Sequence, residues 1–213
     1  MRSQDIIEAV VGDDPEITDY IVDIAKWALA THPDDEEAAM NLANQELADY
    51  RVKFVTKDPI VQRGGRVESD GTIRIPVDDG FAATVNSSTF PDVIRHEYVH
   101  QEQVRHSGEG ASKMAAQSYR KALNPDGSIN RENYYLIPYE IMAYAKSTAD
   151  ELKKAGLSKD QALSLVRTKV KLDRLPQSAK AYVYPYYTRR KKHPQAWHKF
   201  LRYILDYVRN WEQ

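Results

Sequence analysis

The chain has 213 residues, of which 30 are basic, 31 are acidic and 42% are hydrophobic, a composition that favours a folded domain over a disordered or fibrous protein. It contains no cysteine, which excludes disulfides, thiol catalysis and cysteine-ligated zinc, so a bound metal ion would need histidine and carboxylate ligands. Charge is uneven along the chain, with 13 acidic and 2 basic residues in 1–50 against 5 acidic and 15 basic residues in 151–213.

This charge gradient predicts that the two ends of the chain attract each other or face different partners, and the alternative is a pair of solvated helix faces. Near the N-terminus the first apolar run is short and is broken by Glu8. Neither a secretory signal nor a membrane span is therefore predicted, and we expect a cytoplasmic protein that has no membrane partner.

Residues 1–50 are predicted to form helices, the first of them over residues 3–11. Pro15 occupies the first position of a second helix, in which apolar residues recur at three- and four-residue steps. The four carboxylates from Asp34 to Glu37 favour the start of a third helix, because the helix dipole stabilises negative charge in the first turn.

From Arg51 the pattern changes to the alternation that is typical of strands. Two glycine-containing turns, Gly64–Gly65 and Asp70–Gly71, separate the alternating segments. Together they predict a small antiparallel sheet over residues 52–75.

The helix after the sheet is expected to begin beyond Ser88 or Thr89 and to end near His106. Gly108 and Gly110 predict a loop, and a further helix is expected over residues 112–122.

The last third of the chain is predicted to be helical over residues 137–155, over residues 158–169 and after Pro194. In the final helix, five apolar residues at three- and four-residue steps predict a stripe that faces the core: Trp197, Leu201, Ile204, Val208 and Trp211. No internal repeat or linker interrupts the chain, so we expect one domain over residues 1–213, made of an acidic helical region (1–50), a sheet with the site helices (51–155) and a basic helical region (156–213).

The most specific motif of the chain is His96-Glu97-Tyr98-Val99-His100. On a helix, the two histidines project from one face within reach of a common ion, and Glu97 lies about 100° round the helix, close enough to touch a water molecule on that ion. The alternative is a helix with two surface histidines and no metal. The preceding strands, the helix cap and a later carboxylate favour the metal site.

A catalytic zinc site needs a third protein ligand, and Glu140 is the preferred candidate. It lies 40 residues beyond His100 in the first turn of a predicted helix, where the helix dipole and a nearby cation both favour an ionised carboxylate. The alternative role of this residue is that of a simple first-turn charge. Glu132 is the main competitor as a ligand, and Asp150 and Glu151 are further ones, although their place late in a helix beside two lysines predicts exposure to solvent.

At these residues the chain resembles the gluzincin branch of the zincin metallopeptidases, especially short proteins of that kind encoded by phages and mobile elements. The resemblance covers about residues 72–145 and implies an α+β zincin-like fold, in which a small antiparallel sheet packs on the active-site helix and further helices stand at both ends. It implies that His96, His100 and Glu140 bind zinc and that Glu97 is the general base. It also implies that residues 72–77 form the edge strand to which a peptide adds, and that the protein acts in a host cytoplasm or in a virion.

One departure from the family concerns the groups that orient the ligands. Many gluzincins have an acidic residue four positions after the ligand glutamate, where this chain has Tyr144. Gln103, one turn beyond His100, is a candidate for orienting that ring.

The expected reaction is zinc-dependent hydrolysis of a peptide or protein, with cleavage of internal bonds favoured over cleavage of terminal ones. Zinc polarises the scissile carbonyl and lowers the pKa of its water towards about 7, and Glu97 passes the proton of that water to the leaving amine. A donor must also stabilise the oxyanion, and Tyr135 is preferred for this role. The other candidates are Tyr134, Tyr139, Tyr182, Tyr184, Tyr186 and Tyr187. For each of these tyrosines, Tyr135 included, the alternative role is that of a packing residue with its hydroxyl at the rim.

Two other classes of protein remain open. Four basic residues from Arg189 to Lys192, close to several tyrosines, are typical of nucleic-acid binding, although the pI near 6.6 and the acidic N-terminal region disfavour it. A catalytically silent, metal-binding structural or virion protein would carry the same ligands as a peptidase. Cleavage specificity and oligomeric state are not predicted.

Overall fold

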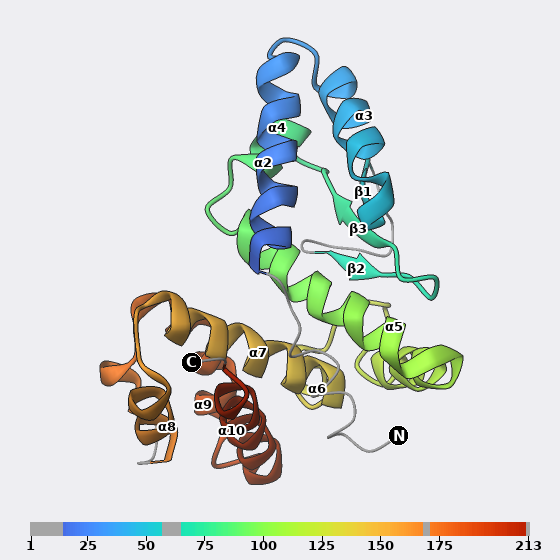
Figure 1. The fold of residues 1–213 in the computed structure, drawn as a ribbon. Helices are drawn as coiled ribbons and strands as arrows, with labels where there is room; N and C mark the ends of the chain where they lie inside the picture. Colours follow the sequence, from blue (N-terminus) through green and yellow to red (C-terminus); the bar gives the residue numbers. More distant parts are fainter. Residues whose placement is uncertain (1–14, 57–64, 168–170, 212–213) are drawn as a thin grey trace. The chain divides into compact units, whose positions relative to one another are not determined.

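The computed structural model describes residues 15–56, 65–167 and 171–211 and shows an α+β fold (Figure 1). It divides into two compact units. The sheet unit comprises residues 12–109, and the helical unit takes in the chain from residue 110 onward. The helix predicted over residues 3–11 lies outside the described residues, and the single domain over 1–213 stays a prediction.

The sheet unit contains helices, one 3-10 turn and three strands (Figure 1). In chain order they are α2 (Pro15–Thr31), α3 (Glu36–Glu46), η1 (Ala48–Tyr50), β1 (Val52–Val55), β2 (Arg66–Val67), β3 (Ile73–Pro76), α4 (Phe81–Val85) and the first part of α5 (Phe90–Arg120).

Two of the predicted N-terminal helices are confirmed, including their first turns. α2 begins at Pro15. α3 begins after Asp35, whose carboxylate accepts a hydrogen bond of 2.9 Å from the N–H of Ala38 and so satisfies one of the free donors of the first turn. Glu36 and Glu37 then place negative charge where the helix dipole favours it.

The sheet is mixed, with the strand order β1-β3-β2. β2 and β3 form the expected hairpin, whose turn is closed by a 2.8 Å hydrogen bond from Glu68 N–H to Thr72 C=O. β3 returns between β2 and β1 and runs parallel to β1. The predicted all-antiparallel sheet is therefore wrong, and residues 72–77 contain the central strand rather than an edge, because the pairing of distant strands is not encoded in local alternation.

Asn44 of α3 closes the outer edge of β1. Its Oδ1 accepts a 2.7 Å hydrogen bond from Phe54 N–H, and its Nδ2 donates a 3.0 Å hydrogen bond to Phe54 C=O. These are the backbone groups of β1 that face away from β3, so Asn44 occupies the place of a further strand. The other edge of the sheet belongs to β2.

One hydrophobic core joins α2, α3, α4, the sheet and the first turns of α5. Its largest side chains include Phe54, Phe81 and Phe90, with Phe81 packed edge-on against Phe54 at 5.0 Å between ring centroids. The acidic helices α2 and α3 are thus part of the core that supports β3 and α5.

α5 is longer than the sequence predicts. It continues through Gly108 and Gly110 to Arg120, so the helix end near His106 and the loop after it are both wrong. A glycine inside a helix costs only about 1 kcal/mol relative to alanine, which weakens a helix without ending it.

The helical unit contains the remaining elements (Figure 1). They are the end of α5, α6 (Arg131–Tyr134), α7 (Pro138–Lys154), α8 (Lys159–Arg167), η2 (Leu172–Arg174), α9 (Gln177–Arg189) and α10 (Pro194–Arg209). α7 packs against α8, α9 and α10, and α10 also packs against α8 and α9.

Helices α7, α8 and α10 confirm the prediction for the last third of the chain. At the start of α8, Ser158 and Gln161 form the capping box: each side chain accepts a hydrogen bond from the backbone N–H of the other. In α10, Ile204 and Val208 of the predicted stripe are buried, and Trp197 and Leu201 are half-buried, whereas Trp211 lies beyond the end of the helix. Phe200, Tyr203 and Tyr207 complete the buried face of α10.

The two units have net charges of opposite sign. Residues 12–109 include 20 acidic and 9 basic side chains, and residues 110–213 include 9 acidic and 20 basic ones. Within the described part of the chain, no helix has the length and apolar character needed to cross a membrane.

Candidate metal centre

His96 and His100 lie one turn apart on α5, and their side chains converge. Their Nε2 atoms are 3.2 Å apart, and the rings are nearly perpendicular, at 89° with 4.7 Å between centroids. Two nitrogens bound to one tetrahedral zinc ion at about 2.05 Å lie about 3.3 Å from each other. The pair therefore has the spacing that two ligands of one such ion need.

Gln103 orients the ring of His100. Its Oε1 lies 2.8 Å from His100 Nδ1, and the Gln103 side chain is buried, at 2% exposed. Because an amide oxygen only accepts hydrogen bonds, His100 carries its proton on Nδ1 and presents the lone pair of Nε2. The position of Gln103 one turn beyond His100 was the signal in the sequence for this contact.

Buried contacts fix the rotation of α5 about its axis. Ile94 and Val99 are fully buried. On the same helix, Gln101 Nε2 donates hydrogen bonds to Gly71 C=O at 2.8 Å and to Tyr50 C=O at 3.1 Å. These bonds tie α5 to the hairpin turn and to the end of η1, and they hold the histidine-bearing face in one orientation.

Glu97 follows His96 on α5 and is buried, at 6% exposed. Its side chain lies against the backbone of Gly65, just before β2, and near Ile75 of β3. No pattern in the sequence points to this contact, because Gly64 and Gly65 are typical of a turn. The general-base candidate is therefore enclosed by the sheet unit rather than exposed on a free helix face.

Glu140 lies where the sequence places it, in the first turn of α7, after the Pro138 that begins the helix. It is buried, at 6% exposed. Burial raises the pKa of Tyr144, and the nearby charges of Tyr135 and Glu140 raise it further. Burial likewise raises the pKa of Tyr186 well above its ordinary value, with a further contribution from the charge of Glu140. Both phenols thus lie near this carboxylate.

Two imidazoles and a carboxylate form a donor set that could hold a metal ion, and His96, His100 and Glu140 supply it. His96 and His100 lie on α5, and Glu140 lies on α7. Nitrogen and oxygen donors of these types match the preferences of zinc.

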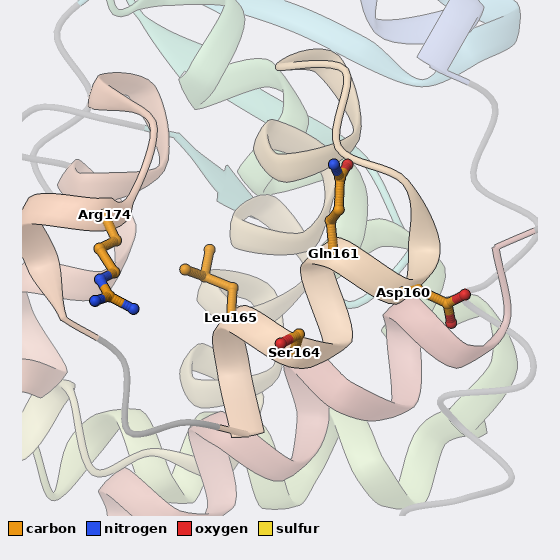
Figure 2. A pocket seen from close by; sticks show the side chains of 5 residues that line it. All are labelled: Asp160, Gln161, Ser164, Leu165 and Arg174. Carbon is orange, nitrogen blue, oxygen red and sulfur yellow. The ribbon is translucent and has the colours of Figure 1, made fainter.

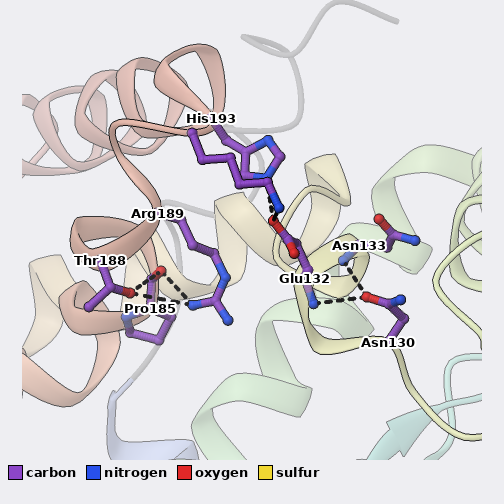
Figure 3. A network of polar contacts seen from close by, with 8 residues as sticks. Asn130, Glu132, Asn133, Pro185, Thr188, Arg189 and His193 are labelled. Atoms are coloured by element: carbon purple, nitrogen blue, oxygen red, sulfur yellow. Dashed lines mark hydrogen bonds and ion pairs between the residues drawn. The ribbon is translucent and has the colours of Figure 1, made fainter.

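Glu132, the main competitor as a ligand, has other partners (Figure 3). Its Oε1 contacts Lys192 Nζ and lies 2.8 Å from His193 Nε2. The hydrogen bond from Lys192, followed by that from His193, lowers the pKa of Glu132 to about 2. Asn130 caps the short helix α6 on which Glu132 stands. This carboxylate therefore ties α6 to the segment between α9 and α10.

Asp150 and Glu151 differ from each other in their surroundings. Asp150 receives two hydrogen bonds from Lys146 Nζ, at 2.8 and 2.9 Å, one turn earlier on α7. Glu151 is buried, at 7% exposed, so the predicted exposure is wrong for this residue. The reason is that α7 is the central helix of its unit and buries polar as well as apolar side chains.

Tyr135 belongs to a cluster of aromatic rings in the helical unit. Its ring makes edge contacts with Tyr134, Tyr144 and Tyr186 at centroid distances of 5.4 to 5.8 Å, and the guanidinium of Arg189 lies 4.6 Å from its centroid. The cluster surrounds the part of α7 that carries Glu140. The role of Tyr135 as an oxyanion donor stays a prediction.

The basic segment before α10 makes several contacts within the helical unit. Arg189 donates a 2.9 Å hydrogen bond to Pro185 C=O (Figure 3). Arg190 stacks 3.7 Å from the centroid of the Tyr187 ring, and Lys192 binds Glu132. Of the nearby tyrosines, Tyr182 and Tyr186 are in the core. Tyr184 is 60% exposed. These contacts leave fewer cations and rings for nucleic acid than the sequence indicates.

A separate surface depression lies between α8 and η2 (Figure 2). It has a volume of about 420 Å³ and is lined by Asp160, Gln161, Ser164, Leu165 and Arg174. None of the predicted site residues lines it.

Comparison with known proteins adds no further assignment. No family model matches the sequence, and no curated protein or solved structure is significantly similar to it. The resemblance to gluzincins therefore stays a prediction.

Proposed function

We propose that this protein is a zinc-dependent metallopeptidase of the gluzincin type, in which His96, His100 and Glu140 hold the ion. The observation that carries the proposal is the 3.2 Å separation of the two histidine Nε2 atoms, with the His100 ring oriented by Gln103. A histidine pair that serves only packing does not need its two Nε2 atoms to converge on one point.

Glu140 is the proposed third ligand because its carboxylate and the two imidazoles form a donor set that could hold a metal ion. Glu132 accepts hydrogen bonds from Lys192 and His193, and Asp150 accepts them from Lys146. These partners stabilise the two carboxylates in positions where they do not contact a metal ion. Glu140 is buried in the first turn of α7, where the helix dipole stabilises the ionised form that a ligand needs.

When bound, zinc supplies a Lewis acid for the scissile carbonyl and makes water more acidic. Glu97 accepts the proton of the attacking water and donates it to the leaving amine, which is general acid–base catalysis by one carboxylate. Tyr135 is the proposed donor to the oxyanion. Its neighbours Tyr144 and Tyr186 belong to the same cluster and are the alternatives.

The proposed substrate is a peptide or protein in extended form, cleaved at internal bonds. Asn44 closes the edge of β1, and β3 is central, so β2 is the strand to which such a peptide would add. The proposed substrate strand therefore lies beside β2 and not beside residues 72–77.

The test is metal content followed by hydrolysis. Wild-type protein expressed with zinc should contain about one zinc ion per chain, lose it to a chelator, and cleave an unstructured protein only when zinc is bound. Glu97→Gln keeps the shape of the side chain and should retain zinc but lose hydrolysis, since an amide cannot accept the proton.

Each outcome of this test separates two classes of protein. Zinc binding without hydrolysis by the wild type would identify a catalytically silent metal-binding protein. Protein that takes up no zinc would refute both the peptidase and the silent metal-binding protein. Equal cleavage by wild type and Glu97→Gln would show that the activity comes from a contaminant.

A further inference from the structure

We propose that Gly65 is a positioning residue for the general base, Glu97. Because Gly65 has no side chain, the Cγ and Cδ atoms of Glu97 occupy the space beside it, and this contact holds the Glu97 carboxylate in its catalytic position. The inference rests on the proposed peptidase function. It assigns a role to the residue just before β2, outside the metal-binding motif.

The contact between Gly65 and Glu97 is tight. A β-carbon at Gly65 would overlap Glu97 Cγ, and it would lie 3.0 Å from Glu97 Cδ and 2.9 Å from Ile75 Cδ1. Carbon atoms that are not bonded to each other approach to about 3.5–4.0 Å. No residue other than glycine therefore fits without a shift of Glu97, of Ile75 or of the strand.

Backbone conformation does not explain the glycine. Gly71, Gly80, Gly127 and Gly156 have positive φ, which favours glycine in turns, whereas Gly65 is not among the residues with positive φ. A β-carbon at Gly127 or Gly156 would meet nothing within 4 Å. Gly65 is thus set apart by the close approach of its backbone to Glu97.

A small movement of Glu97 cannot make room for a β-carbon at Gly65. Cγ is attached to Cβ, whose place is fixed by the backbone of α5, and α5 is held by the two hydrogen bonds of Gln101. The relief that remains is rotation about the Cα–Cβ bond, which swings the whole carboxylate, and one of the three rotamers is rare in helices. Gly65→Ala should therefore misplace the base while leaving the histidines unchanged.

Ile75 provides a matched control. Its Cδ1 is the end of a flexible side chain, and Ile75→Val removes that atom and the overlap with it. If the effect of Gly65→Ala came from Ile75, the double variant Gly65→Ala/Ile75→Val would restore activity. If it comes from Glu97, the double variant stays impaired.

The experiment measures kcat, KM, zinc content and the melting temperature for wild type, the two single variants and the double variant. Gly65→Ala should lower kcat about 100-fold, as expected for a catalytic group displaced by about 1 Å, with KM and zinc content unchanged. Ile75→Val should retain most of the activity and should not rescue Gly65→Ala.

A second measurement does not depend on activity. Gly65→Ala should lower the melting temperature by about 4 °C, a typical effect of overpacking, and by much less in a Glu97→Ala background, because that variant has no Cγ to meet the new β-carbon. If Gly65→Ala alone does not fold, recovery of folding in the Glu97→Ala background supports the inference, and failure to recover overturns it.

Failure of this inference differs from failure of the proposed function. Given an active wild type, the inference alone is overturned by any of three results. These are full kcat in Gly65→Ala, full rescue of that variant by Ile75→Val, and an equal loss of melting temperature in the wild-type and Glu97→Ala backgrounds. A wild type that binds no zinc or does not cleave protein overturns the proposed function and this positioning role with it.

Discussion

Replacing Gln103 by leucine removes the acceptor that orients His100 and keeps a side chain of similar size. Gln103 is 2% exposed, and its Oε1 lies 2.8 Å from His100 Nδ1, so no water molecule can readily take its place. Loss of such a contact to a metal-binding histidine weakens metal affinity about 10- to 100-fold, which is about 1.4 to 2.7 kcal/mol. The N–H of the half-buried His100, left without this acceptor, should also lower the free energy of unfolding of the metal-free protein by about 1 kcal/mol.

The assay is competition for zinc against a chromophoric chelator of known affinity. Gln101→Leu is the matched control, because Gln101 lies on the same helix, is also buried and hydrogen-bonds only backbone carbonyls among its described contacts. That variant should lower thermal stability by similar amounts with and without zinc, and it should weaken zinc binding less than Gln103→Leu does, because His96 and His100 lie on one helix and keep their spacing when α5 shifts as a whole. A Kd for Gln103→Leu within twofold of wild type, or an equal loss in both variants, would refute the orienting role of Gln103.

Three further predictions concern the third ligand, a surface ion pair and the edge of the sheet. Glu140→Ala should weaken zinc binding by orders of magnitude, and in thermal scans it should lower the melting temperature in zinc but little in chelator. Glu132→Ala should leave zinc affinity unchanged. The reverse pattern would show that Glu132 is the third ligand. Because its partners lower the pKa of Glu132 to about 2, the stability that it contributes is present above its unfolded-state pKa and is lost as pH falls towards 2. Urea unfolding of Glu132→Gln should therefore differ from that of wild type at neutral pH and converge with it in acid, and a difference that does not depend on pH would contradict the pairing. Asn44→Ala leaves two backbone groups of Phe54 without their partner and should lower the free energy of unfolding by about 2 kcal/mol in the same assay, whereas unchanged stability would exclude a closed edge.

Local signals in the sequence predict much of the fold. Helix starts at Pro15, Asp35 and Ser158 depend on capping groups within four residues, and all three are confirmed. The parallel pairing of β1 with β3 was missed because it joins segments that are about 20 residues apart and leaves no local pattern. α9 was missed because Pro185 lies inside it, where proline normally ends a helix.

The candidate site follows the same division between local and distant contacts. The convergence of His96 and His100 and the contact with Gln103 follow from helical spacing, so the sequence could predict them. The partners of Glu132 could not be predicted, since Lys192 and His193 lie about 60 residues away in sequence. The closeness of Gly65 to Glu97 depends on the packing of β2 against α5, to which no pattern in the sequence points.

X-ray absorption at the zinc edge reports both the amount of metal and the ligands of the ion, so one measurement examines the whole proposed centre. For the zinc-loaded protein, the account predicts about one zinc per chain, with two imidazole nitrogens at about 2.0–2.1 Å and carboxylate or water oxygens completing the shell. His100→Ala should lose one imidazole, and Glu140→Ala should lose an oxygen ligand and most of the affinity. A zinc content near zero, or a spectrum with no imidazole contribution, would contradict the account.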